Sequence, residues 1–330
     1  MPHKDPDEAV EFIFKYLPQI PFWPQLPKRD IREGMVAQFS EHFPCLKVTG
    51  DGLFYDNCNV ENDLEVFYGK IIAGDSGYFG ISRDYAAGLY SFYEKLKANG
   101  LEKIEFLKCH ITGPFTFAAS ITNREGVAFL HDEVFMQAVI KGLAMKAQWQ
   151  LRMFSQFGKK AILFIDEPYL GSFGSAYTPI SREKVVKVYE ELTAAVKSPE
   201  VLIGVHCCGN TDWSMFTAVR GIDIISFDAF GFSDKFAVYA SDLKGFYKRG
   251  GLICWGVVPT QEAAEYLEPD PLLRKIEDGI AALAKKGVDE ALARENLLLS
   301  PSCGLGMLDE AKAAKVFSCL SEVSSILRNS

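Results

Sequence analysis

Short apolar stretches that alternate with amphipathic helical stretches constrain the fold of this chain more than any other feature. Continuous apolar runs of strand length suit parallel strands that are buried on both faces. Six clear runs of this kind occur at 104–110, 161–166, 201–206, 223–228, 252–258 and 296–301. Stretches with the polar and apolar spacing of surface helices lie between them, for example at 132–157, 181–197, 271–286 and 309–327. The sequence therefore predicts βαβ units and a mostly parallel sheet.

The number of strands favours a barrel. Two weaker stretches, at 19–23 and 46–49, bring the count of expected strands to eight. Eight strands in about 300 residues is typical of a (β/α)₈ barrel. We therefore predict an α/β fold, a single TIM barrel over residues 1–330, with a hairpin or lid-like insertion around 51–91. A doubly wound open sheet is the alternative, but no Gly-x-Gly-x-x-Gly follows a strand, which weakens its dinucleotide-binding version.

Composition and charge exclude several classes of protein. The chain is 48% apolar and 24% charged, which is typical of a globular protein, and its net charge is −8 with no run of Lys and Arg. Because phosphate neutralisation supplies much of the affinity for nucleic acid, we expect no nucleic-acid partner. The longest apolar runs are far too short to span a membrane, and the polar N-terminus does not resemble a signal peptide. We therefore expect no membrane association, a cytoplasmic location and reduced cysteines.

Polar residues gather where the predicted strands end. In a (β/α)₈ barrel the functional site lies at the carboxyl ends of the strands. Asp166, Glu167 and Pro168 end one strand, and Asp228 ends another. The segments His206–Asn210 and Ser302–Leu305 end two more. Several polar ends at one face are a stronger indication of a site than any single motif.

His206 and Cys208 are candidate metal ligands. Residues two apart on an extended strand project to the same side, and the residue between them points away, so Cys207 cannot easily join them. Imidazole nitrogen and thiolate sulfur are preferred zinc ligands, and Cys303 at a strand end across the barrel mouth would supply a third. The alternative is a buried histidine hydrogen-bonded to backbone, beside two cysteines that only pack.

The motifs at the strand ends resemble a known family. FIDEPYL (164–170), HCCGN (206–210), SFDAF (226–230) and PSCGLGM (301–307) resemble the catalytic barrel of cobalamin-independent methionine synthase. They also resemble the related corrinoid-dependent methyltransferases of the uroporphyrinogen decarboxylase superfamily. ITGPFTFA (111–118) and PFWPQLP (21–27) resemble the third-strand and first-strand turns of this family. The resemblance spans nearly the whole chain in the same order.

The resemblance implies a set of site residues. It assigns zinc ligation to His206, Cys208 and Cys303. Asp228 occupies the position of the family's acidic ligand, a Glu that is one methylene longer, so it is a metal ligand or a neighbour that supports the ligands. Asp166 matches the carboxylate that contacts the amino group of homocysteine, and we place Glu167 and Tyr169 beside it as substrate-binding residues, with packing of its own loop as the alternative for Tyr169. Asp166 and Asp228 are the candidate catalytic residues.

The implied activity is zinc-dependent transfer of a methyl group to a thiol, as in methionine biosynthesis. Asp166 favours homocysteine as the acceptor, with coenzyme M as an alternative. The chain leaves no room for the family's additional N-terminal barrel, so we expect methylcobalamin, free or on a corrinoid protein, or another small donor. A uroporphyrinogen-decarboxylase-like enzyme that uses Arg29 and Arg32, and a non-catalytic zinc- or corrinoid-binding accessory protein, are the remaining alternatives.

Overall fold

The computed structural model of this protein describes residues 1–50, 52–56, 59–98, 100–123, 125–176, 178–261 and 267–329. These residues divide into two compact units. The first unit comprises Met1, His3–Glu167 and Glu191–Leu202. The second comprises Pro2, Pro168–Glu190 and the chain from Ile203 onward. The prediction of a single domain over 1–330 remains a prediction.

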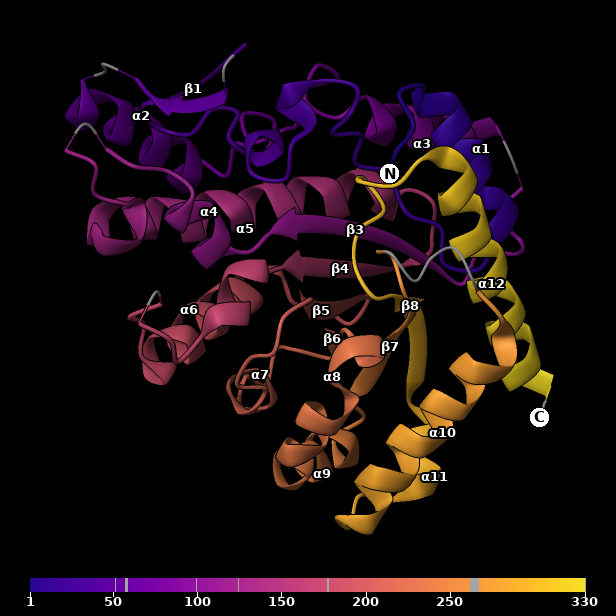
Figure 1. Cartoon of the computed structure of the whole chain (residues 1–330). Coiled ribbons are helices and arrows are strands. Elements are labelled where there is room, and N and C mark those ends of the chain that lie inside the picture. The colour runs from indigo at the N-terminus through magenta and orange to yellow at the C-terminus, as the bar shows by residue number, and fades with distance from the viewer. Residues whose placement is uncertain are drawn as a thin grey trace. The chain divides into compact units, whose positions relative to one another are not determined.

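The first unit combines a parallel strand pair with helices and a hairpin (Figure 1). Strands β3 (Phe106–Thr112) and β4 (Lys160–Asp166) pair in parallel along their whole length. Strands β1 (Leu46–Thr49) and β2 (Gly52–Tyr55) pair antiparallel. The helices are α1 (Pro6–Tyr16), α2 (Val60–Ile72), α3 (Ala87–Ala98), α4 (Pro114–Ala119) and α5 (Glu133–Ser155), with short 3₁₀ turns η1 (Ile31–Glu33), η2 (Ala37–Phe39) and η3 (Phe129–His131).

Local sequence signals explain where the longest of these helices begins and what it buries. Asp132 caps α5, because its carboxylate accepts hydrogen bonds from the N–H groups of Val134 and Phe135. The helix packs against β3 and β4 and buries more than half of its residues (Figure 1). One of them is Lys146, which is fully buried and whose ammonium has no hydrogen-bond partner among the described residues. Burial lowers the pKa of Lys146 to about 8, and the nearby Glu41 carboxylate raises it in part.

The second unit carries the remaining parallel strands. Strand β5 (Val201–Cys207) starts in the first unit and pairs in parallel with β6 (Ile224–Phe227), which pairs with β7 (Leu252–Val258) and then β8 (Leu297–Pro301). The helices are α6 (Arg182–Val196), which ends in the first unit, α7 (Ser214–Ala218), α8 (Ala229–Phe236), α9 (Ala240–Lys248), α10 (Pro269–Lys285), α11 (Glu290–Glu295) and α12 (Glu310–Asn329), with 3₁₀ turns η4 (Pro168–Ser172) and η5 (Ala237–Tyr239).

Aromatic side chains form much of the core of the second unit. Phe227 of β6 stacks on Phe236 of α8, with ring centroids 3.8 Å apart. Trp213 and Trp255 pack edge-on against Phe227. All four side chains are 1% exposed or less. This cluster fixes α8 against β6 and β7, and the residue that links β6 to α8 is Asp228.

The prediction of a closed eight-stranded TIM barrel is wrong. Six parallel strands form one sheet in the order β3-β4-β5-β6-β7-β8, and β1 and β2 form a separate antiparallel sheet. Residues 19–23 contribute one isolated bridge, between Phe22 and Lys108, in place of a strand. Pro21 and Pro24 flank this bridge, and proline has no N–H to donate to a ladder. The stretch at 46–49 forms a strand, but it pairs within its own hairpin.

Two further expectations concern the chain outside the sheet. The segment 51–91 includes β2, α2 and the start of α3, and residues 51, 57 and 58 lie outside the described residues. Cys45 is disulfide-bonded, so the expectation that the cysteines are reduced is wrong at this position.

Among the described residues, no helix has both the length and the apolar character needed to cross a bilayer.

Candidate metal and thiol site

Four of the predicted site residues lie at the carboxyl ends of strands in the second unit. His206 is the penultimate residue of β5, and Cys208 directly follows that strand. Asp228 follows β6, and Cys303 comes two residues after β8. Because β5 to β8 are parallel and consecutive in the sheet, these ends lie along one edge (Figure 1).

The structure brings the predicted nitrogen and sulfur ligands into contact. Hydrogen bonding with Cys208, and then with His206, is the main cause of the shifted pKa of Cys303, so these three side chains lie near one another. The carboxylate of Asp228 interacts electrostatically with both Cys303 and His206. Cys303 is therefore the centre of the group, which we call the strand-end cluster: His206, Cys208, Asp228 and Cys303.

The two thiols of the cluster divide the roles of thiolate and thiol. The hydrogen bond from Cys208, followed by that from His206, lowers the pKa of Cys303 well below its usual range. The same hydrogen bond, together with burial, raises the pKa of Cys208. The cluster therefore favours the thiolate form at Cys303 rather than at Cys208, and a thiolate is the form of cysteine that binds metal and attacks electrophiles.

Strand alternation separates Cys208 from its neighbour. Cys207 is fully buried, whereas His206 and Cys208 are both half-buried. The turn after Cys208 is possible because two glycine backbones cross there: a Cβ on Gly209 would lie 2.8 Å from the Cα of Gly171. No larger residue fits at Gly209, which explains the glycine that follows the two cysteines.

A third glycine allows the ends of β6 and β8 to approach each other. A Cβ on Gly256, in β7, would lie 2.6 Å from the carbonyl oxygen of Phe227 and 3.0 Å from the Cα of Ser302. Those two residues directly precede Asp228 and Cys303. The missing side chain at Gly256 is therefore one reason why Asp228, after β6, and Cys303, after β8, can approach each other across β7.

Sequence reasoning missed one residue at this site. The Nδ1 atom of His206 lies 3.0 Å from the hydroxyl oxygen of Ser226, which is opposite His206 in the β5–β6 register. Ser226 is 3% exposed. The available signal was a hydroxyl residue inside an otherwise apolar strand, because a buried hydroxyl needs a hydrogen-bond partner.

Asp228 has a structural role as well as its place in the cluster. Its carboxylate caps α8 by accepting a hydrogen bond from the N–H of Gly231 at 2.8 Å. Burial raises the pKa of Asp228, and the charge of Cys303 adds to that effect, while the N–H groups of Gly231 and Phe230 oppose it. A carboxylate already engaged by backbone donors is better placed to support the cluster than to act as a free ligand.

The donor set suits a metal even though it is not yet arranged around one. Among the described residues, no three His, Cys, Asp or Glu side chains are disposed about a common metal position. The chemistry of the strand-end cluster nevertheless fits zinc, because its side chains are one imidazole, two cysteine sulfurs and one carboxylate. Because Nδ1 of His206 faces Ser226, Nε2 is the ring nitrogen that remains to bind a metal.

Asp166 and Glu167 belong to the first unit, and their side chains differ in role. Asp166 is half-buried, and its carboxylate makes no hydrogen bond or ion pair with the described residues. Glu167 is fully buried, and its carboxylate accepts hydrogen bonds from the N–H groups of Phe115 and Thr116 at the start of α4. The Asp166 carboxylate is therefore not engaged by the described residues, whereas the Glu167 carboxylate holds α4 in place.

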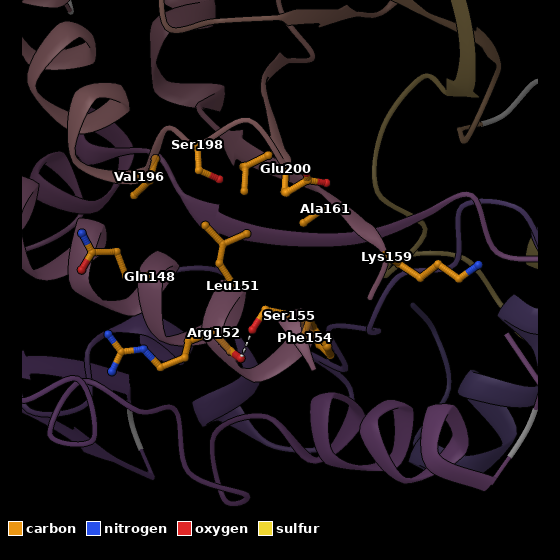
Figure 2. A pocket seen from close by; sticks show the side chains of 11 residues that line it. Gln148, Leu151, Arg152, Phe154, Ser155, Lys159, Ala161, Val196, Ser198 and Glu200 are labelled. Carbon is orange, nitrogen blue, oxygen red and sulfur yellow. Dashed lines mark hydrogen bonds between the residues drawn. The ribbon is translucent and has the colours of Figure 1, made fainter. Parts of the chain in front are cut away.

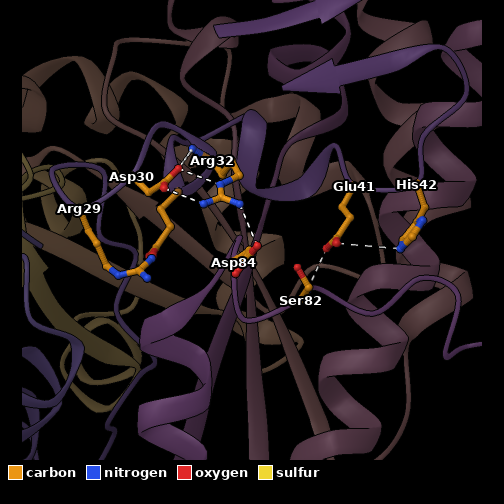
Figure 3. Close-up of polar contacts among 8 residues, drawn as sticks. Arg29, Asp30, Arg32, Glu41, His42, Ser82 and Asp84 are labelled. Carbon is orange, nitrogen blue, oxygen red and sulfur yellow. Dashed lines mark hydrogen bonds and ion pairs between the residues drawn. The ribbon is translucent and has the colours of Figure 1, made fainter. Parts of the chain in front are cut away.

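The remaining predicted substrate-binding residue and the two arginines of the alternative reaction also have defined surroundings. Tyr169 lies in η4, where its carbonyl accepts a hydrogen bond from Ser172. Arg29 pairs with the buried Glu33, and Arg32 pairs with Asp30 and Asp84 (Figure 3). Both guanidinium groups are thus neutralised by carboxylates of the chain itself.

One hollow in the first unit lies away from the predicted site residues. It has a volume of about 310 Å³ and is found in the first unit, near the amino ends of β4 and β5 (Figure 2). Residues of α5 and the end of α6 line it, together with Ser198, Glu200 and the first residues of the strands. The Arg152 guanidinium, from one of its lining residues, is bonded to Ser76. None of the predicted site residues contributes to it.

Comparisons with known proteins support the fold. No protein-family profile and no curated protein matches the chain. A crystal structure from Listeria monocytogenes, provisionally identified as a vitamin-B12-independent methionine synthase, is similar with a TM-score of 0.53 and 16% sequence identity. The match covers 98% of this chain and 85% of that chain. At this identity the similarity is one of fold.

Proposed function

We propose that this protein is a zinc-dependent methyltransferase that transfers a methyl group to a thiol, with homocysteine as the favoured acceptor. The observation that carries the proposal is the strand-end cluster, in which Cys208 and His206, at the end of β5, both shift the pKa of Cys303, which follows β8. The fold similarity to the Listeria structure supports the same conclusion, because that protein carries the name of a methionine synthase.

The residues of the cluster would supply three ligands and leave a further position for substrate. His206 would bind through Nε2, and Cys208 and Cys303 through sulfur. Bound Zn²⁺ supplies the positive charge that deprotonates a thiol while leaving its sulfur nucleophilic. Asp228 keeps a negative charge close to the ligands. The acceptor sulfur then forms a bond to the methyl carbon as the bond from that carbon to the donor breaks, and the donor leaves with the electron pair.

Asp166 is the residue that favours an amino-thiol as acceptor. Its carboxylate is half-buried and has no partner among the described residues, so it can receive an ammonium group. As the donor we propose methylcobalamin, free or on a corrinoid protein, or another small methyl donor. A thiol without an amino group, such as coenzyme M, would use the same strand-end cluster without Asp166.

The other candidate functions have less support. A decarboxylase that holds substrate carboxylates with Arg29 and Arg32 would have to displace the carboxylates of Glu33, Asp30 and Asp84 from those arginines. A decarboxylase reaction would also give Cys208 and Cys303 no role. A non-catalytic zinc- or corrinoid-binding accessory protein would share the cluster but would show no open coordination position.

Two measurements on the purified protein test the proposal. We expect about one zinc per chain, and we expect methyl transfer from methylcobalamin to at least one member of a panel of thiols. X-ray absorption at the zinc edge should show one more sulfur atom bound to zinc after the accepted thiol is added. An accessory protein would not show this increase. Cys319→Ser should keep the zinc and the methyl transfer of the wild type, because Cys319 is a free buried cysteine on α12 and is not part of the strand-end cluster. Absence of zinc and of transfer in the folded protein would reject the proposal.

A further inference from the structure

We propose that Ser226 is a positioning residue for His206: it holds the imidazole with Nδ1 toward its own hydroxyl, so that the lone pair of Nε2 is presented to the metal position. The proposal rests on the zinc site proposed above, and it adds a residue that sequence reasoning did not reveal. It concerns the orientation and tautomer of a single ring, and both can be measured directly.

The backbone register sets up the contact. In the parallel β5–β6 ladder, His206 stands opposite Ser226, and the next pair in the ladder is Cys207 with Phe227. Opposed residues of neighbouring strands project to the same face of a sheet. The distance from Nδ1 to the hydroxyl oxygen is 3.0 Å, which is a normal hydrogen bond.

Burial makes this hydrogen bond selective. Ser226 is 3% exposed, and every residue of β6 is buried. Water therefore competes poorly for the hydroxyl, and an unsatisfied hydroxyl in such a strand would be costly. Because Nδ1 faces Ser226, Nε2 is the ring nitrogen that remains for the metal position. One ring thus joins a buried serine to the proposed metal position.

The chemistry of imidazole explains why the contact matters. A neutral imidazole carries one N–H and one lone pair, and the lone pair is the metal ligand. If the hydroxyl oxygen of Ser226 accepts from Nδ1–H, the lone pair must be on Nε2. Hydrogen-bond partners of ligating histidines that fix the tautomer in this way typically change metal affinity 10- to 100-fold when removed.

The first test is zinc affinity, measured by competition with a chromophoric chelator. Ser226→Ala should weaken zinc binding about 10- to 100-fold. Ser40→Ala is the matched control and should leave it unchanged, since Ser40 is also 3% exposed and bonds only a carbonyl of its own turn, that of Ala37. Zinc affinity of Ser226→Ala equal to that of the wild type, in a folded variant, would overturn the proposal.

The second test reads the ring itself. In protein labelled with ¹⁵N-histidine, long-range ¹H–¹⁵N correlation distinguishes a protonated Nδ1 from a protonated Nε2, and His206→Gln identifies the signal. We expect a protonated Nδ1 in the zinc-loaded wild type. A protonated Nε2 would overturn the proposal whatever the affinity of the variants. Ser226→Thr, which keeps the hydroxyl, should retain the wild-type pattern.

The two proposals can fail separately. If the wild type binds no zinc, the zinc site fails, and the ring of the metal-free protein still reports on Ser226. In that case a change of the His206 tautomer between the wild type and Ser226→Ala supports the positioning role, and identical spectra reject it. If zinc binds equally well to both proteins, the positioning role fails and the zinc site stands.

Discussion

The Glu167 carboxylate joins the end of β4 to the start of α4 through Thr116, which lies 51 residues earlier in the chain. It accepts hydrogen bonds from the backbone N–H of Thr116 at 2.6 Å and from its hydroxyl at 2.5 Å. Gly113 leaves the space for it, because a Cβ there would lie 2.4 Å from Glu167 Oε2. The Gly-Pro-Phe-Thr turn and the Asp-Glu-Pro turn are therefore parts of one buried interaction.

This interaction predicts a loss of stability in Glu167→Gln. The carboxylate accepts from three donors of one turn, and an amide would present an N–H group to one of them. Hydrogen bonds to a charged group are worth about 1.5–3 kcal/mol each, so we expect a loss of roughly 2 kcal/mol or more in the free energy of unfolding. Chemical denaturation measures it. Asp166→Asn, the same change one residue earlier, should unfold nearly as the wild type does; equal losses in both variants would refute this role of Glu167.

The strand-end cluster predicts opposite behaviour of adjacent cysteines. Cys208→Ser should lose most of the zinc, because Cys208 contacts Cys303. Cys207→Ser should keep it, because the fully buried Cys207 points to the other side of the strand. Metal analysis after dialysis against zinc-free buffer measures both. Similar zinc loss in the two variants would show that the ligands are not arranged by strand alternation.

Asp166 predicts discrimination between acceptors. A hydrogen bond between a carboxylate and an ammonium in a partly dry site contributes about 1.5–3 kcal/mol, or roughly ten- to a hundredfold in affinity. Asp166→Asn should therefore weaken homocysteine binding by that factor, and leave zinc content and the binding of a thiol without an amino group unchanged. Calorimetric titration with both thiols tests this. Unchanged homocysteine affinity in the folded variant would remove Asp166 from the site.

The choice of methyl donor is testable by direct competition. We expect turnover with methylcobalamin, or with a methylated corrinoid protein, to be much faster than turnover with a methyl-folate. The comparison is made at equal donor concentration with the same thiol, and with His206→Gln as the inactive control. Equal rates with the two donors would contradict the preference for a corrinoid.

Lys146 predicts a pH dependence of stability. Its pKa is about 8 in the folded protein against a usual value of 10.5, so the unfolded chain binds the proton more tightly. Below pH 8 the buried charge destabilises the fold fully, and between about pH 8 and 10.5 the folded protein loses its proton first, so stability rises by roughly 3 kcal/mol. Glu41 and His42 are the titratable groups that interact electrostatically with the ammonium.

Lys146→Met should remove this rise and be more stable than the wild type at pH 7. Denaturation curves at pH 7 and pH 10 give the difference between the two proteins, which cancels the titration of other groups. Lys141→Met on the same helix is the control, because Lys141 is only half-buried and pairs with Glu191. A variant that follows the wild-type pH profile would show that Lys146 is not the group responsible.

The six strongest apolar runs could be assigned from the chain alone, because a strand buried on both faces needs a continuous apolar run, which is a local property. They form β3 to β8, and the residues at their ends include the whole strand-end cluster. Whether the sheet closes into a barrel could not be predicted from local sequence pattern. Residues 19–23 have a strand-like composition, yet Pro21, and Pro24 directly after them, cannot donate ladder hydrogen bonds, and 46–49 pairs with its own hairpin partner. The roles of Ser226 and Glu167 also depend on partners 20 and 51 residues away, and such pairings exist only once strand register and helix docking bring the atoms within hydrogen-bonding distance.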